Sequence, residues 1–181
     1  MKTNKITSDG FTTISLHNRG FTLIELLIVI TIIATLAVTV FVALNPAQRL
    51  KDAKDARRTS DVDTILTAIH AAIVDNKGSV PTNLPAAGTE RQLGTGSSVD
   101  CATALTANGC NTPASTACTD LMANVAIDLI PYLKSMPIDP SGGTTYTPLK
   151  TGYSVARDAN DIITITACGK EGTGANIQSS R

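Results

Sequence analysis

One apolar run near the N-terminus constrains the fold of this chain of 181 residues more than any other feature. Between Phe21 and Leu44 the sequence carries a single charged residue, Glu25. At about 1.5 Å of rise per residue, a helix of this length covers roughly 36 Å, which exceeds the hydrocarbon core of about 30 Å. Residues 21–44 are therefore predicted to span a membrane. Glu25 is unexpected there, because a carboxylate within a span costs about 3 kcal/mol or more.

The segment before this run, residues 1–20, is polar, mostly uncharged and without periodicity, which indicates a leader. An ordinary secretory signal has an apolar core of about 7–15 residues and a small-x-small cleavage site after it. The run here is longer and contains Glu25, so cleavage after the span is disfavoured, whereas an uncleaved anchor stays possible. The basic residues do not define orientation, because three precede the run and five follow it closely.

The junction between leader and run reads Arg-Gly-Phe-Thr-Leu-Ile-Glu over residues 19–25. This motif, followed by an unbroken apolar helix, resembles the prepilin signal of bacterial type IV pilins and type II secretion pseudopilins. The resemblance implies that a membrane-embedded prepilin peptidase cuts after Gly20 on the cytoplasmic side and that the new amino group of Phe21 is N-methylated. It also implies a leader that stays in the cytoplasm and a head that is exported.

Each residue of the motif has a physical reason. Gly20 has no side chain and a permissive backbone, which lets an extended segment enter a protease. Glu25 lies one helical turn after Phe21, on the same face. In the family this carboxylate is thought to meet the N-terminal ammonium of a neighbouring subunit, which implies an assembly role for Glu25. The alternative is that Glu25 reaches the cytoplasmic interface of the membrane and has no such role.

Two further features concern the helical region. Thr31, Thr35 and Thr39 recur every four residues, and their hydroxyls could bond either a neighbouring helix or their own backbone. Pro46 predicts a helix break, seen as a kink or a restart, because proline lacks the backbone donor. Many type IV pilins carry a proline near this position.

An amphipathic helix is predicted over residues 48–76, within a segment 45–78 that Gly78 terminates. Charged residues dominate positions 49–61, which we expect to face solvent or neighbouring subunits. His70 lies among apolar neighbours and is interpreted as a packing residue. Apolar residues recur at spacings of three and four on one face: Leu50, Ala53, Val62, Ile65, Leu66, Ile69 and Ile73.

Residues 79–119 are rich in Pro, Gly, Ser, Thr, Ala and Asn and predict a loop region. None of the cysteines forms a C-x-x-C pair and only His17 and His70 could add imidazole, so zinc is disfavoured. An even cysteine count in an exported, loop-rich head predicts disulfides. Three pairings exist, and we favour Cys101 with Cys110 and Cys118 with Cys168, because the second pair would tie the loop to the C-terminal sheet.

The segment 120–181 predicts a short helix over residues 120–129 and then an antiparallel sheet from strands at 144–147, 153–157 and 161–168. Residues 170–181 are predicted to be a frayed tail. The Pro-Ile-Asp-Pro sequence at 137–140 resembles the turn before the sheet of the major pseudopilin. Loops of that sheet bind calcium in major pseudopilins, which makes four residues calcium candidates, although such residues also form turns: Asp139, Asp158, Asn160 and Asp161.

The expected fold is α+β, with a long N-terminal helix packed on a small antiparallel head, as in type IV pilins. Without the leader the chain holds 12 basic and 14 acidic residues, and it has no Trp, so nucleic acid is not an expected partner. No nucleophile has an obvious base, so no enzyme and no cofactor beyond calcium is predicted.

The expected function is that of a structural subunit of a pilus-like filament, first single-pass in the cell membrane and then in an extracellular or periplasmic filament. Its expected partners are related subunits, the prepilin peptidase, the inner-membrane assembly machinery and, before assembly, membrane lipid. Three alternatives stay open: a pseudopilin of a type II secretion system, a competence pilus subunit and, from another class, a singly anchored exported binding protein.

Overall fold

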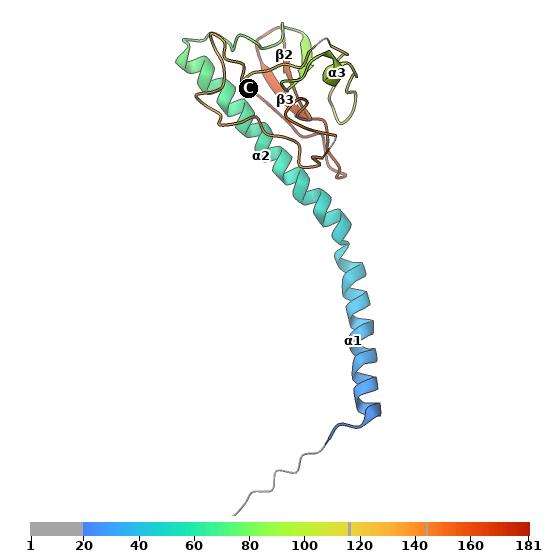
Figure 1. Ribbon diagram of the computed structural model, residues 1–181. Coiled ribbons are helices and arrows are strands. Elements are labelled where there is room, and N and C mark those ends of the chain that lie inside the picture. Colours follow the sequence, from blue (N-terminus) through green and yellow to red (C-terminus); the bar gives the residue numbers. More distant parts are fainter. Residues whose placement is uncertain (1–19, 116, 144) are drawn as a thin grey trace, which may run out of the picture. The chain divides into compact units, whose positions relative to one another are not determined.

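The computed structural model describes residues 20–115, 117–143 and 145–181, shown in Figure 1. Predictions for the leader before residue 20, including the role of His17, lie outside these residues. The chain divides into two compact units, Met1–Leu44 and Asn45–Arg181.

The first unit is represented by one helix, α1, which spans Leu23–Leu44 and has no buried residue. The helical stretch that begins at Leu23 is the only one in the described residues that is long and apolar enough to cross a membrane. The hydroxyls of Thr31, Thr35 and Thr39 donate to carbonyls three residues earlier, at 2.8, 2.9 and 2.8 Å. Of the two alternatives for this stripe, the structure therefore has the bond to the helix's own backbone.

The second unit begins with helix α2, Pro46–Asp75, with proline in its first turn. Asn45, just before it, takes a left-handed conformation with φ of 40°. The helix ends where Gly78, at φ of 90°, donates its N–H to the Ile73 carbonyl at 2.8 Å. The predicted apolar face is exposed at its start, where Leu50 is 62% exposed, because the head covers only the later part of the helix. The buried residues of α2 that are apolar are Val62, Ile65, Leu66, Ala68, Ile69 and Ala72.

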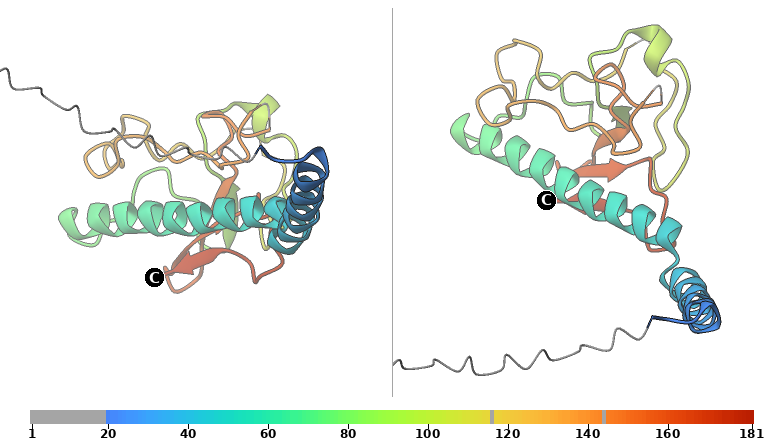
Figure 2. Two further views of the ribbon diagram at one scale, coloured as in Figure 1. Left: turned by 90° about the horizontal axis from the view of Figure 1, so that it is seen from below. Right: turned by 60° about the horizontal axis from the view of Figure 1, so that its bottom comes forward.

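Four antiparallel strands in the order β1-β2-β3-β4 form the sheet: Thr89–Gln92, Tyr153–Arg157, Ile163–Ala167 and Gln178–Ser180. The register pairs Val155 with Ile165 at the centre of the hairpin. Strands β3 and β4 contact α2, and Figure 2 shows the C-terminus beside this helix. The core therefore lies between α2 and the sheet. The predicted α+β fold, with its long apolar N-terminal helix and small antiparallel sheet, is confirmed.

The predicted helix over residues 120–129 is wrong, because this stretch consists of turns. Leu121 and Leu129 are both buried, so these apolar residues anchor a loop in the core and do not form one face of a helix. Thr82 and Ile127 exchange backbone and side-chain hydrogen bonds at 3.0 and 3.1 Å, which ties the stretch to an earlier loop. A helix of this length is only marginally stable by itself in water, so the hydrogen bonds to the earlier loop determine the conformation of this stretch.

Other corrections concern the edges of the sheet. Of the predicted strand 144–147, residue 144 is not described and the rest forms turns, with an isolated bridge from Thr147 to Lys150. Strand β1 takes the edge instead, within the region predicted as loop, which also holds the short helix α3, Ser98–Cys101. The predicted frayed tail is also wrong, because Gln178–Ser180 pairs with β3.

Both disulfides form, but not in the favoured pairing. The bonds are Cys101–Cys118 and Cys110–Cys168. The reason lies in local loop contacts, because the Asn108 side chain donates to the carbonyl of Cys168 at 2.7 Å and so holds the loop before Cys110 at the end of β3. The expected tie between loop and sheet therefore exists, through a different cysteine.

Candidate functional site

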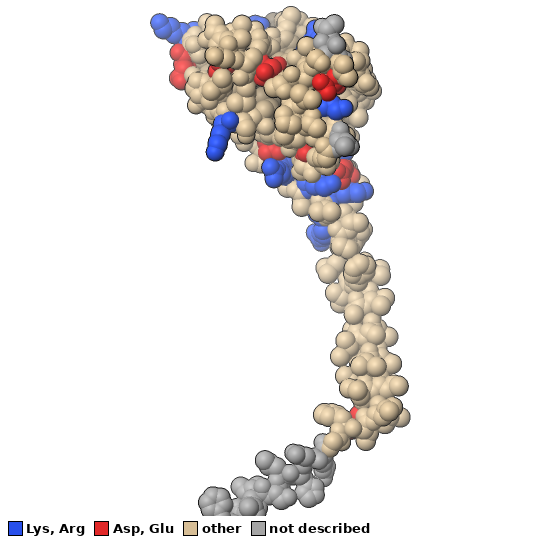
Figure 3. All heavy atoms as spheres, viewed as in Figure 1, with Lys and Arg blue, Asp and Glu red and all other residues tan. Residues whose placement is uncertain are grey.

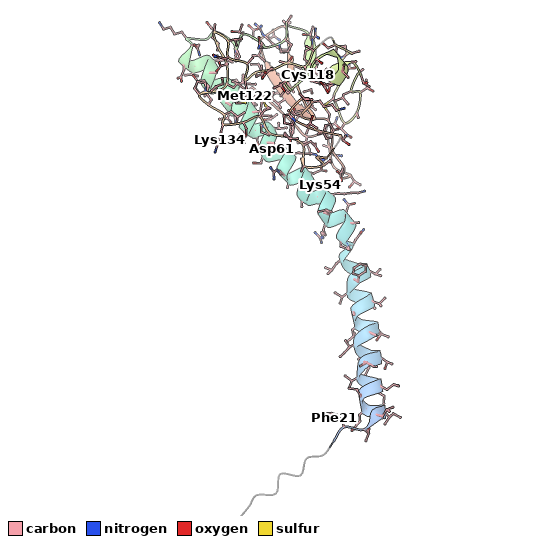
Figure 4. All side chains as sticks on the ribbon, in the orientation of Figure 1. Phe21, Lys54, Asp61, Cys118, Met122 and Lys134 are labelled. Carbon is pink, nitrogen blue, oxygen red and sulfur yellow. A yellow bond between two sulfur atoms is a disulfide. The ribbon has the colours of Figure 1, made fainter. Side chains whose placement is uncertain are left out.

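The junction of leader and helix is open and non-helical. Gly20, Phe21 and Thr22 precede the first turn of α1, and the Phe21 side chain is 88% exposed. Figure 4 shows Phe21 immediately before the helix begins. A protease must bind its substrate in an extended form, so the bond between Gly20 and Phe21 lies where cleavage requires no unwinding of α1.

Thr22 and Glu25 close the start of α1 with a reciprocal capping box. The backbone N–H and the hydroxyl of Thr22 donate to Oε2 of Glu25 at 2.8 and 2.9 Å, and the Glu25 N–H donates to Thr22 Oγ1 at 3.2 Å. Oε1 of Glu25 has no hydrogen-bond partner among the described residues. The role of Thr22 was not predicted, although Thr-x-x-Glu before an apolar run is the usual signal for such a box.

After this box, the only polar side chains on α1 are those of Thr31, Thr35 and Thr39, and all the others are apolar. Every one of its residues is exposed, and Glu25 is its only charged residue. On the face drawn in Figure 3, the same helix has no Lys or Arg, and an acidic residue is visible only near its start. Because so large an apolar surface is unfavourable in water, lipid or other apolar helices must cover it.

The head holds a buried charge cluster around Arg58, a residue predicted to face solvent or neighbouring subunits. Arg58 and Asp139 are both fully buried, and the guanidinium Nε and Nη2 donate to the two carboxylate oxygens at 2.7 Å each. Nη1 donates to Asp55 at 2.6 Å and Nη2 to the Ser141 hydroxyl at 2.7 Å. The prediction for Arg58 was wrong because its partner Asp139 lies 81 residues later in the sequence, and no local pattern predicts a contact over that separation.

Glu171 and Asp55 extend this cluster to the segment after β3. Lys54 Nζ donates to Glu171 at 3.0 Å, and the Ser141 hydroxyl donates to the same carboxylate at 2.5 Å. Asp55 accepts the N–H groups of Glu171 and Gly172 at 3.2 and 2.7 Å. The cluster therefore joins α2, the turn at Asp139 and the C-terminal segment.

The charges of the cluster shift the pKa values of its members. Burial alone would lower the pKa of Arg58, but its hydrogen bonds to Asp139 and Asp55 prevail and raise it, so the guanidinium stays charged. Burial likewise opposes ionisation of Asp55, yet hydrogen bonds from Glu171, Arg58 and Gly172 lower its pKa. Hydrogen bonds from Ser141 and Lys54 lower the pKa of Glu171 to about 2.

The calcium candidates are engaged in other contacts. Asp139 is paired with Arg58, Asp158 accepts the N–H groups of Asn160 and Ile162 at 2.8 Å, and Asp161 pairs with Arg157. The described part of the chain contains no group of three or more His, Cys, Asp or Glu side chains arranged for a metal ion. Calcium binding stays an untested prediction.

His70, predicted to pack, is partly buried on α2, and its Nε2 atom has no hydrogen-bond partner in the described structure. Pro46 lies where α2 begins, after the interruption at Asn45. Neither residue takes part in the cluster around Arg58.

Replacing Arg58 with Met is expected to destabilise the head by about 3–5 kcal/mol, because Asp139 would remain buried without its counter-charge. Arg57→Met is a matched control, since the Arg57 side chain is 69% exposed and its loss should change stability by about 0.5 kcal/mol or less. Urea unfolding of the full chain in detergent measures both. Equal midpoints for the two variants would contradict the importance of the buried pair.

Acid is expected to destabilise the head in a defined range. Glu171 and Asp55 have pKa values lowered in the folded state, so their contribution is complete above the unfolded values of about 4 and is lost as pH falls towards 2. Urea midpoints should stay level from about pH 7 to 5 and then decrease. Glu171→Gln should cost up to about 1 kcal/mol at pH 7 and flatten the acid decrease. An unchanged slope would exclude Glu171 as a contributor.

Comparison with known proteins gives one match. The family model for the prokaryotic N-terminal methylation motif matches residues 16–41, which include the junction and most of α1. Comparison with curated proteins and with solved structures found no match. The motif supports a type IV pilin-like or pseudopilin subunit, and with the fold it indicates a structural subunit. The resemblance is thus confirmed: this chain carries the class III signal peptide of type IV pilins, followed by their apolar N-terminal helix.

Proposed function

We propose that the chain is a prepilin whose mature form is a structural subunit of a type IV pilus-like filament. The observation that carries the proposal is the arrangement at the junction. An exposed, non-helical Gly20–Phe21 bond directly precedes a capped helix whose exposed surface is apolar apart from Glu25 and three threonines. A cleavage signal, a membrane anchor and an assembly surface are thereby contained in one segment.

The disulfides support an orientation that the basic residues left undecided. Disulfides form and persist in oxidising compartments, and both bonds of this chain lie in residues 101–168 of the second unit. These bonds support an exported head, with the residues before α1 facing the cytoplasm. The prepilin peptidase then cuts after Gly20 on the cytoplasmic side, and Phe21 becomes the methylated N-terminus.

Assembly follows from the apolar surface of α1. While the subunit is in the membrane, lipid covers this surface, and the assembly machinery extracts the helix into a bundle of identical helices. Glu25 has one carboxylate oxygen engaged by Thr22, which leaves Oε1 able to accept the Phe21 ammonium of a neighbouring subunit. Pairing of the two charges would offset their desolvation and select the axial register.

Cleavage is tested with Gly20→Val. A β-branched side chain next to the scissile bond restricts the backbone that the peptidase must bind, so the full-length precursor should accumulate without filaments. Thr31→Val, within α1, is the control and should be processed normally. Mass spectrometry of the membrane fraction and electron microscopy of sheared cells give the results. A Gly20→Val chain with wild-type mature mass and filaments would refute the proposal and favour an anchored binding protein. Wild-type filaments confined to the periplasm would indicate a pseudopilin.

The role of Glu25 is tested separately from cleavage. Glu25→Ala should be cleaved and hold a folded head but lose filaments by about tenfold or more, because the ammonium of the neighbour would lack its partner. Thr22→Val removes the hydroxyl of the capping box and keeps the carboxylate, so it should retain most filaments. If both variants lose filaments equally, capping and not pairing is the role of Glu25.

A further inference from the structure

A groove of about 690 Å³ follows the face of α2 that points away from the core. Most of the helix residues that line it are exposed, whereas Ala68 at its edge is buried, and one wall is formed by Tyr132, whose hydroxyl donates to Asp75 at 2.9 Å. Its floor consists mainly of small side chains, among them Ala56, Ser60, Thr64 and Thr67.

These side chains make the groove suited to another helix. The hydroxyl of Thr64 donates to the carbonyl of Ser60 at 2.7 Å, and that of Thr59 donates to the carbonyl of Asp55 at 3.1 Å, so both hydroxyls are satisfied within α2. The distance between packed helices depends on the size of the side chains at the contact, and small ones permit close approach. Asp63 is the only charged residue that lines the groove, and it forms no ion pair with any described residue.

The two halves of α2 carry opposite charge. Residues 46–58 contain five basic and two acidic residues, a net charge of +3, and residues 59–75 contain three acidic and no Lys or Arg, a net charge of −3. Figure 3 shows Lys and Arg gathered around the first part of α2 in the view drawn. Arg49 is exposed and, like Asp63, has no ion-pair partner in the described part of the chain.

This charge pattern selects an axial offset between copies. Subunits that leave one membrane share one polarity, so their α2 helices run parallel. Without offset, like halves would face each other and repel, whereas a shift along the axis brings a basic half beside an acidic half. Arg49 precedes Asp63 by almost four helical turns and lies on the same face, and a shift of roughly 21 Å aligns the two.

We propose that the groove on α2 is the docking site for a second copy of this chain, which inserts the first half of its own α2 and pairs its Arg49 with Asp63 of the first copy. The inference rests on the proposed filament function and assigns it a specific lateral contact. The contact is heterologous, because a different patch of each copy is used, and it can therefore propagate along a filament.

Charge exchange in the full chain tests this contact. Asp63→Arg and Arg49→Asp should each reduce the yield of sheared filaments about fivefold or more, relative to mature subunit in the membrane, and the double variant should recover at least half of the wild-type yield. Asp100→Arg is the control, because it makes the same charge change in α3, outside α2, and should keep wild-type yield. Non-reducing electrophoresis checks that both disulfides form in every variant.

The outcomes separate this contact from the proposed function. Wild-type yield from Asp63→Arg, or a double variant no better than the single ones, would overturn the docking site and leave the filament function standing. Absence of filaments from wild-type cells that produce the cleaved subunit would refute the filament function itself. Loss by both single variants with recovery in the double variant supports the contact.

Discussion

The head of this protein depends on the buried pair of Arg58 and Asp139. A charge without a partner is very unfavourable in a protein interior, so neither side chain can be buried before the other arrives. Arg58 comes from α2 and Asp139 from a turn 81 residues later, and Asp55 and Glu171 add the C-terminal segment. Three distant parts of the chain must therefore assemble together. The pair also keeps Asp139 from serving as a free ligand in the turn before the sheet.

A second constraint is that α1 and α2 use their surfaces differently. Helix α1 has no buried residue, so all of its side chains are available to lipid or to other subunits. Helix α2 buries one face under the sheet and leaves the opposite face open, lined by small residues. One face of α2 therefore stabilises the subunit while the other is available for assembly.

Local signals in the sequence were sufficient for α1, α2 and the hairpin of β2 and β3. The apolar run, Pro46 and the periodicity of the following segment correspond to α1 and α2, and the Thr, Val and Ile-rich stretches correspond to β2 and β3. Strand β1 has the sequence Thr-Glu-Arg-Gln, which lacks any apolar alternation, and β4 has only three residues. Neither could be recognised locally, because each is defined by its pairing with a strand of the hairpin and not by a pattern of its own. The helix predicted over residues 120–129 is wrong for the opposite reason. The leucines there are spaced as in an amphipathic helix, but they are buried by turns that pack on the core.

By itself the sequence determined the signal, the apolar helix and the chemistry available at Phe21 and Glu25, because these depend on residues that are neighbours in the chain. Only the tertiary structure decided the cysteine pairing, the burial of Arg58 and the groove on α2. Disulfide connectivity depends on which loops meet in space, as Asn108 and Cys168 do. The burial of the ion pair and the open face of α2 likewise depend on which segments of the chain cover this helix. The spacing of residues along the sequence does not predict which segments those are.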